Sequence, residues 1–93
     1  MSELKKLHMI VFGKVQGVFF RAHVREQARQ LGLKGWVRNL PNGTVELFAE
    51  GPEDVLQKFI ILVEKGSSAS HIEDTKIRWL PAEGKFEAFE IRY

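Results

Sequence analysis

Apolar residues recur along the chain with two different periods, and stretches of one period alternate with stretches of the other. The first stretch, Leu7 to Phe12, is an apolar run of the length typical of a buried strand. The next stretch has helical spacing and is followed by Gly32, which predicts a helix ending there. The apolar positions of this predicted helix are Phe20, Val24, Ala28 and Leu31.

The middle of the chain predicts a hairpin. Gly35 to Arg38 forms a short strand that contains a tryptophan and a valine. The segment Pro41-Asn42-Gly43 predicts a turn, because Asn-Gly is a strong hairpin signal. Residues alternate in character along the next strand, which is therefore expected to be half-buried. Its inward positions are Val45, Leu47 and Ala49.

The last third of the chain predicts a second helix and two further strands. Pro52 is suited to the first position of the helix, and Gly66 to the residue that ends it. Two acidic residues directly after the proline stabilise the positive end of the helix dipole. A strand is expected over Lys76 to Leu80, then a turn over Pro81 to Lys85. The last strand is marked by Phe89, Ile91 and Tyr93.

The order of elements is β-α-β-β-α-β, with a short final strand added. This is an α+β, ferredoxin-like pattern of the split β-α-β type: an antiparallel sheet with two helices on one face. A right-handed crossover makes the first two strands parallel, with the third strand between them. The loop after the first strand and the end of the second strand then share one sheet edge. We therefore expect Gly13 to Arg21 and Asn39 to be neighbours in space.

Composition excludes several broad classes of protein. The chain has 93 residues, of which 44% are hydrophobic and 28% charged, which predicts one globular domain over residues 1–93. No apolar run approaches the roughly 18–20 residues of a membrane-spanning helix, and the first residues do not form a secretion signal. The absence of cysteine excludes disulfides, thiolate metal sites and a cysteine nucleophile. We expect a cytoplasmic monomer.

Charge narrows the class of ligand. The chain carries 14 Lys and Arg against 12 Asp and Glu, a formal net charge of +2, without a long block of like charges. Proteins that bind duplex nucleic acid usually show a dense basic stripe. The sequence therefore favours a small anion as ligand, and we expect neither nucleic acid nor a membrane as partner.

The segment Gly13 to Arg21 is unusual for a loop that leads into a helix. It contains no Ser, Thr, Asp or Asn to cap the first backbone N–H groups of the helix. Arg21 lies in the first turn, where a cation opposes the helix dipole. An anion bound at this point would remove both problems, because it accepts the N–H groups and pairs with the guanidinium. The alternative is a glycine-rich turn whose N–H groups are satisfied by water.

Two motifs along the chain resemble the signatures of the acylphosphatase family. The first is Gly13-Lys14-Val15-Gln16-Gly17-Val18-Phe19-Phe20-Arg21, in a loop variant similar to that of the animal branch. The second is Gly35-Trp36-Val37-Arg38-Asn39, followed by Gly43-Thr44-Val45 and Gly51-Pro52, and the similarity continues through the C-terminal Phe89 to Tyr93. The resemblance thus covers nearly the whole chain.

The resemblance implies hydrolysis of acyl phosphates, such as acetyl phosphate, carbamoyl phosphate and 1,3-bisphosphoglycerate, to a carboxylate and inorganic phosphate. Arg21 would clamp the phosphoryl group, and Asn39 would hold the attacking water. No metal and no cofactor are expected. Backbone N–H groups of the loop would bind the phosphoryl group; these belong to Gln16, Gly17, Val18, Phe19, Phe20 and Arg21.

The implied roles agree with the chemistry of the side chains. Phosphoryl transfer needs positioning and charge stabilisation more than covalent chemistry, and a guanidinium fits two phosphate oxygens. The amide of Asn39 can accept a hydrogen bond from water but is no strong base, so the phosphate of the substrate is expected to take the proton. An asparagine before a turn also often bonds its own backbone, which is the alternative for Asn39.

Other candidate chemistries have weaker support. The three histidines, His8, His23 and His71, lie on separate segments without the spacing of a metal site, and the serines of the Gly66–Ser70 loop lack a nucleophile elbow. Glu46 and Glu50 share one strand face and are expected to be solvated. A non-catalytic phosphate-binding module, or a part of a larger carbamoyl-phosphate-processing enzyme, remains an alternative, although the length favours a free-standing enzyme.

An RNA-binding module is the remaining alternative, because split β-α-β domains bind RNA by stacking bases on sheet aromatics. The rings that could serve this purpose on predicted strands are those of Phe12, Phe48 and Trp79. The characteristic motif of such domains is absent. Two observations distinguish the RNA-binding hypothesis from the others: which face of the sheet carries these rings, and whether that face is uncovered.

Overall fold

The computed structural model describes residues 3–17 and 19–93. These residues form five strands and two helices in the predicted order. The bounds of the elements are β1 Leu4–Lys14, α1 Phe20–Gln30, β2 Lys34–Asn39, β3 Val45–Pro52, α2 Glu53–Lys65, β4 His71–Pro81 and β5 Phe89–Arg92.

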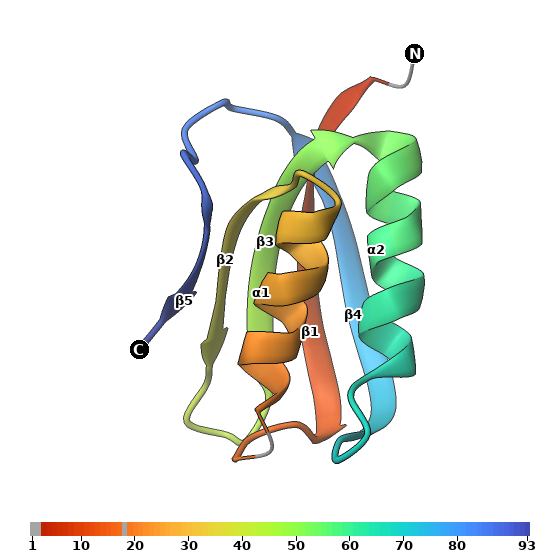
Figure 1. Cartoon of the computed structure of the whole chain (residues 1–93), viewed down its shortest axis with the longest axis vertical. Helices are drawn as coiled ribbons and strands as arrows, with labels where there is room; N and C mark the ends of the chain where they lie inside the picture. Colours follow the sequence, from red (N-terminus) through yellow and green to blue (C-terminus); the bar gives the residue numbers. More distant parts are fainter. Residues whose placement is uncertain (1–2, 18) are drawn as a thin grey trace.

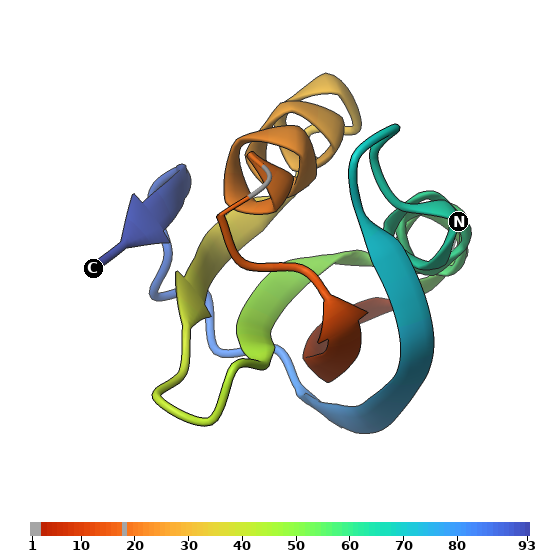
Figure 2. The ribbon, with the colours of Figure 1, turned by 90° about the horizontal axis from the view of Figure 1, so that it is seen from below.

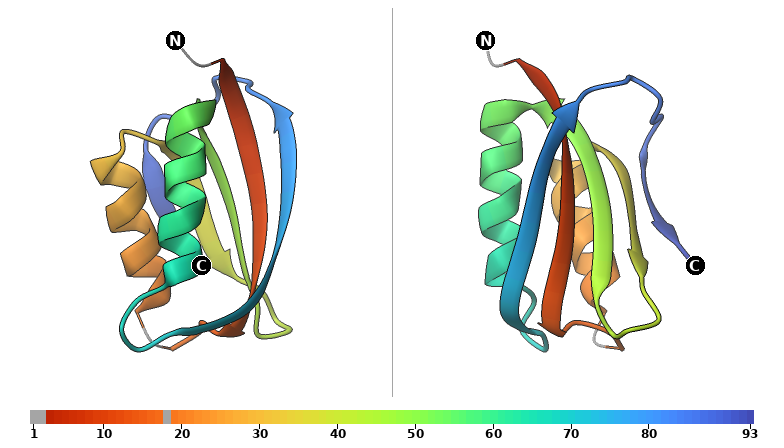
Figure 3. Two further views of the ribbon diagram at one scale, coloured as in Figure 1. Left: turned by 90° about the vertical axis from the view of Figure 1, so that its right-hand side faces the viewer. Right: turned by 180° about the vertical axis from the view of Figure 1, so that it is seen from behind.

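The strands form one sheet in the order β4-β1-β3-β2-β5. As expected, β1 and β2 are parallel to each other because both pair antiparallel with β3, which lies between them. The final strand β5 pairs parallel with β2, so the sheet is mixed and only its first four strands are antiparallel. Both helices cover one face of the sheet and leave the other uncovered, as the side and rear views show (Figure 1 and Figure 3).

The hydrophobic core lies between the sheet and the helices. Strand alternation sends every second residue of β1 and β3 to the helix side, where Met9 of β1 stands opposite Leu47 of β3. The second helix contributes Phe59, whose ring meets that of Phe89 edge-on at 6.1 Å. Other fully buried members of the core are Leu7, Val11, Phe20, Val24, Ala28, Val37, Val45, Ala49, Leu56 and Val63.

Two strands are longer than the apolar pattern predicts. β1 begins at Leu4 instead of Leu7, and β4 begins at His71 instead of Lys76. The extra residues are held by backbone pairing to neighbouring strands, which hydrophobic periodicity does not report. β4 is an edge strand with mostly exposed side chains, so its polar half carries no alternation.

The ends of the other elements also differ slightly from the prediction. Pro52 is the N-cap of α2 and not its first helical residue, because its backbone is extended with ψ at 140°. Gly66 ends the helix as predicted, with a positive φ of 74°. The last strand stops at Arg92, which leaves Tyr93 outside the sheet and fully exposed.

Three connections gather at one end of the sheet: the loop from β1 to α1, the turn from β2 to β3, and the loop from α2 to β4 (Figure 1 and Figure 2). The predicted proximity of Gly13–Arg21 to the end of β2 is therefore confirmed. Among the described residues no helix is long and apolar enough to cross a membrane.

Candidate active site

Gly13 directs the chain from β1 into the loop. The pairing of β1 with β4 shifts register between Phe12 and Gly13, and Gly13 has a φ of 131°. A Cβ atom built at this position would lie 2.1 Å from the carbonyl oxygen of His71. Only glycine fits here, so the close approach of the two strands fixes where the loop begins.

The loop itself contains two residues with left-handed backbone. Gly17 has a φ of 71°, and Phe19 has φ 58° and ψ 22°. Left-handed residues in a turn direct neighbouring N–H groups toward a common point and form anion-binding concavities. Val18, which was expected to supply one of the backbone donors, lies outside the described residues.

The first helix begins without a side-chain cap. Phe19 is its N-cap residue and makes no capping hydrogen bond, and no acidic residue lies in its first turn. Phe20 and Arg21 are the first two helical residues, so a cation lies in the first turn. The N-terminus of α1 thus combines N–H donors, the positive end of the dipole and a guanidinium, which is a favourable arrangement for an anion.

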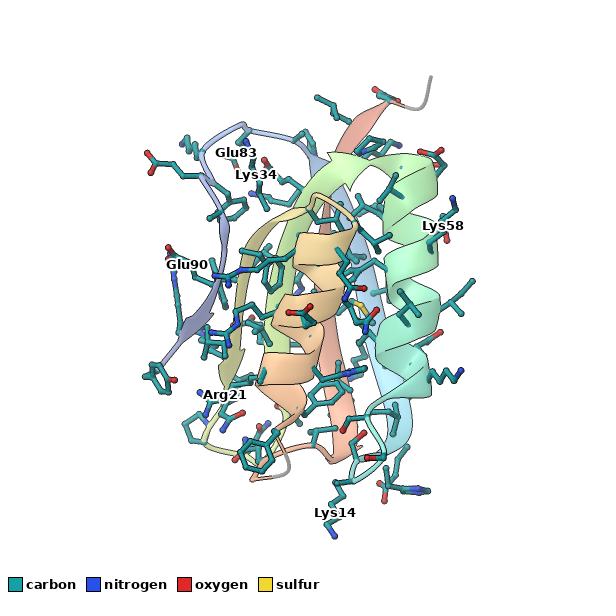
Figure 4. The ribbon with its side chains drawn as sticks, in the orientation of Figure 1. Lys14, Arg21, Lys34, Lys58, Glu83 and Glu90 are labelled. Atoms are coloured by element: carbon teal, nitrogen blue, oxygen red, sulfur yellow. The ribbon has the colours of Figure 1, made fainter. Side chains whose placement is uncertain are left out.

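Arg21 extends from α1 toward the C-terminal strand. Its Nη1 donates to the carbonyl oxygen of Arg92 at 3.3 Å, and its Cζ lies 4.8 Å from the centre of the Tyr93 ring. Figure 4 shows the side chain at the lower end of α1, on the side of β5. A guanidinium has five N–H donors, and among the described residues only one protein acceptor is seen for this one. Arg21 and Gly17 both line a pocket of about 340 Å³.

The side chain of Gln16 connects the loop to the turn between β2 and β3. Its Nε2 donates to the carbonyl oxygens of Leu40 and Thr44, both at 2.8 Å. The sequence suggested Gln16 only as a backbone donor to phosphate, and this contact was missed. No local sequence pattern predicts this contact, because the two partners lie 24 and 28 residues further along the chain.

Asn39 is the last residue of β2 and lies next to the turn that Gln16 contacts. It has the same strand parity as buried Val37 and therefore belongs to the helix side of the sheet. Its Oδ1 is buried and has no hydrogen-bond partner among the described residues. A buried acceptor without a partner is costly, and holding a water or ligand group is one explanation.

The alternative role of Asn39, bonding its own turn, belongs to a neighbour instead. Asn42 Oδ1 accepts hydrogen bonds from the backbone N–H and the hydroxyl of Thr44, at 3.1 and 2.6 Å. The turn is thus stabilised locally without Asn39. Its side-chain oxygen is consequently available for a function that needs an acceptor.

The uncovered face of the sheet carries two of the three rings proposed for stacking bases. Phe12 and Phe48 lie on this face, whereas Trp79 has the opposite parity and pairs with buried Leu7.

The rings on this face are covered by cations of the protein itself. Lys76 lies over Phe12 and Lys6 over Phe48, each at 5.5 Å from the ring centre, while Arg38 and Arg92 lie over Trp36 at 5.0 and 4.7 Å. Stacked bases would have to displace them, so the arrangement does not favour RNA.

Glu46 is the centre of an ionic cluster on the same face. His8 Nε2 lies 2.8 Å from its Oε2, and Arg38 Nη2 lies 2.7 Å from its Oε1. Burial alone would raise the pKa of Glu46, but the hydrogen bonds with His8 and Arg38 outweigh burial and hold this pKa below its ordinary value of 4.5. The expectation that Glu46 is solvated is wrong, because its side chain is only 15% exposed and is paired. Glu50 is half-buried and accepts two backbone N–H groups from the loop after β4.

The remaining candidate residues do not converge. Within residues 3–17 and 19–93 there is no group of three or more His, Asp or Glu side chains that could hold a metal ion. The Ser70 hydroxyl donates to the carbonyl oxygen of Ser67 and accepts its N–H, so it stabilises the loop before β4. Neither serine is hydrogen-bonded to His71 in the way that a catalytic pair requires.

The fold and this loop together define a class: a small α+β protein whose first helix begins without a side-chain cap and carries an arginine in its first turn. The family profile described as "Acylphosphatase" matches residues 7–91. An acylphosphatase of Aeropyrum pernix is 45% identical over 93 residues, which are 99% of this chain and 92% of the relative. The chain belongs to the acylphosphatase family.

Solved structures agree with this assignment. The crystal structure of acylphosphatase from Bacillus subtilis superposes with a TM-score of 0.92 at 40% identity, covering 98% of this chain and all of the other. Part of the crystal structure of full-length HypF, in its phosphate- and nucleotide-bound form, matches all of this chain with a TM-score of 0.85 at 26% identity. That region is 12% of the larger protein.

Proposed function

We propose that this protein hydrolyses acyl phosphates to a carboxylate and inorganic phosphate, with the phosphoryl group held at the N-terminus of α1. The observation that carries the proposal is the combination of an uncapped helix start with Arg21 in the first turn. Membership of the acylphosphatase family supports the same reaction. We call the backbone N–H groups of residues 16–21 and the guanidinium of Arg21 the cradle. Acetyl phosphate, carbamoyl phosphate and 1,3-bisphosphoglycerate all present the same phosphoryl group to it.

In the proposed mechanism the cradle binds the phosphoryl group, and Asn39 positions the attacking water. Backbone N–H groups of residues 16–21 and the guanidinium of Arg21 hold the phosphoryl oxygens and stabilise the charge that develops on them. The buried Oδ1 of Asn39 accepts a hydrogen bond from the attacking water. The two hydrogen bonds from Gln16 to the turn between β2 and β3, which we call the tether, keep the cradle aligned with Asn39.

The chemical step needs no strong base from the protein. The water oxygen forms a bond to phosphorus while the bond from phosphorus to the acyl oxygen breaks, and the carboxylate leaves with that electron pair. The proton of the water passes to an oxygen of the phosphoryl group. A carboxylate is a good leaving group, so an asparagine suffices to orient the nucleophile.

Hydrolysis of benzoyl phosphate by the purified protein with excess chelator tests this proposal. We expect chelator-insensitive turnover that is lost in Arg21→Ala and retained in Arg25→Ala. Arg25 is the matched control, since it lies one turn further along α1 and does not line the pocket. Equal turnover in both variants would contradict the role of the cradle.

A non-catalytic phosphate-binding module is the second candidate, because the phosphate- and nucleotide-bound HypF contains a region of the same fold. A folded protein that binds phosphate without hydrolysing benzoyl phosphate would favour it. The expectations of a cytoplasmic location, of a monomer, and of no nucleic-acid or membrane partner stay predictions. Sedimentation at working concentration tests the monomer.

A further inference from the structure

The pocket beside Arg21 is too apolar to serve a phosphoryl group alone. It measures about 340 Å³, within the roughly 300–1,000 Å³ range of small-molecule sites. Apart from the guanidinium, its larger walls are apolar or aromatic: Val15, Phe19, Phe20, Ile91 and Tyr93. A phosphoryl group placed at Arg21 would therefore have a largely apolar surface next to its substituent.

Phe19 is the most unusual member of this wall. Its backbone is left-handed, with φ 58° and ψ 22°, a conformation that bulky residues rarely adopt. Its side chain is 87% exposed, so the ring contributes little to the core. Strained residues persist where function needs them. An exposed aromatic ring in the lining of a pocket needs a reason beyond folding.

Tyr93 supplies a second exposed ring, next to Arg21. It is fully exposed, and the centre of its ring lies 4.8 Å from the Arg21 guanidinium carbon. Phe19, in the loop before α1, and Tyr93, after β5, line the same pocket. Aromatic rings gain from both area burial and ring geometry when a further ring packs against them.

We propose that this pocket binds the acyl end of the substrate and selects acyl phosphates with an apolar, preferably aromatic, acyl group. The ring of such a group packs against Phe19 and Tyr93 while its phosphoryl group is held at Arg21. Small acyl groups such as acetyl leave both rings exposed. This proposal rests on the proposed function and adds the substrate class.

The test compares kcat/KM for benzoyl phosphate and acetyl phosphate in the wild type, in Phe19→Asn and in Ile61→Asn. Asparagine tolerates the left-handed backbone of position 19, so the substitution removes the ring with little strain. Ile61 is the control, because its side chain is 65% exposed on α2 and does not line the pocket. The ratio of the two values cancels intrinsic reactivity and any effect on the cradle common to both substrates.

We expect the benzoyl-to-acetyl ratio to fall about tenfold in Phe19→Asn, which corresponds to about 1.4 kcal/mol, and to stay unchanged in Ile61→Asn. Most of the change should appear in KM. An unchanged ratio in Phe19→Asn, or an equal fall in both variants, would overturn the proposal.

Binding of two phosphonates separates this proposal from the proposed function. Phenylphosphonate and methylphosphonate cannot be hydrolysed as acyl phosphates, so calorimetry with them is informative even if the protein has no turnover. We expect phenylphosphonate to bind about tenfold more tightly to the wild type and to lose this advantage in Phe19→Asn. Equal affinities in the wild type would overturn the acyl pocket, whereas absence of turnover with a retained phenyl preference would overturn the proposed function alone.

Discussion

Replacing Gln16 by leucine removes both hydrogen bonds of the loop tether while nearly preserving side-chain volume. A net contribution of about 0.5–1.5 kcal/mol per bond sets the scale. Each carbonyl keeps another donor, since Leu40 O also accepts from Gly43 N–H at 3.2 Å and Thr44 O from Leu40 N–H at 2.9 Å. Neither oxygen is orphaned, so we expect a loss of about 1–2 kcal/mol in the free energy of unfolding.

The effect on activity should exceed the effect on stability. The cradle and Arg21 remain on one continuous segment, so binding of phosphate survives in Gln16→Leu. The alignment of the cradle with Asn39 is lost, and a displacement of about 1 Å can cost roughly 100-fold in rate. We therefore expect kcat to fall by at least about tenfold, with a much smaller change in KM.

Urea unfolding and steady-state hydrolysis of benzoyl phosphate measure the two effects. Gln57→Leu is the matched control, because Gln57 is an exposed glutamine on α2, away from the loop. An unchanged urea midpoint together with an unchanged kcat in Gln16→Leu would refute the tether. A rise in KM at constant kcat would instead assign Gln16 to phosphate binding.

Four further predictions concern the cradle, the nucleophile, the loop and the ionic cluster. Arg21→Ala should raise the dissociation constant for phosphate about 100-fold by calorimetry, from the loss of two charge-assisted bonds, with an unchanged circular dichroism spectrum. Asn39→Ala should lower kcat about 100-fold or more while phosphate affinity stays within about twofold, and lost affinity at a normal rate would reverse the two roles. Gly13→Ala should destabilise by about 3 kcal/mol in urea unfolding because its Cβ meets backbone, whereas Gly17→Ala, with open space around its Cβ, should cost about 1 kcal/mol. The stabilising pairing of Glu46 is present above its unfolded pKa and is lost as pH falls below 4.5, so Glu46→Gln should flatten the decline of the urea midpoint in acid.

Much of the fold follows from apolar periodicity, because the core-forming parts of the strands and helices bury every second or every third to fourth residue. The polar end of β4 does not follow, since residues 71–75 are held by backbone pairing to β1 and not by burial. The apolar pattern also does not predict the parallel pairing of β5 with β2, because a short alternating strand can pair with either edge of the sheet. Pro52 shows the same limit at a helix end, where proline fits both the cap and the first position.

The site shows a similar division. The absent cap before α1 and the positive φ of Gly17 were predictable, because both depend on residue types within one loop. The tether from Gln16 to Leu40 was not, since it joins segments that only the sheet brings together. The contact of Arg21 with Tyr93 likewise depends on the final strand packing beside α1.

Hydrolysis of benzoyl phosphate in water enriched in heavy oxygen tests the central claim most directly. Attack of water on phosphorus, with Asn39 positioning it, places the heavy oxygen in inorganic phosphate and leaves benzoate unlabelled. Mass spectrometry of both products distinguishes the two. Label in benzoate would show that water attacks the acyl carbon, which would contradict a site built around the phosphoryl group.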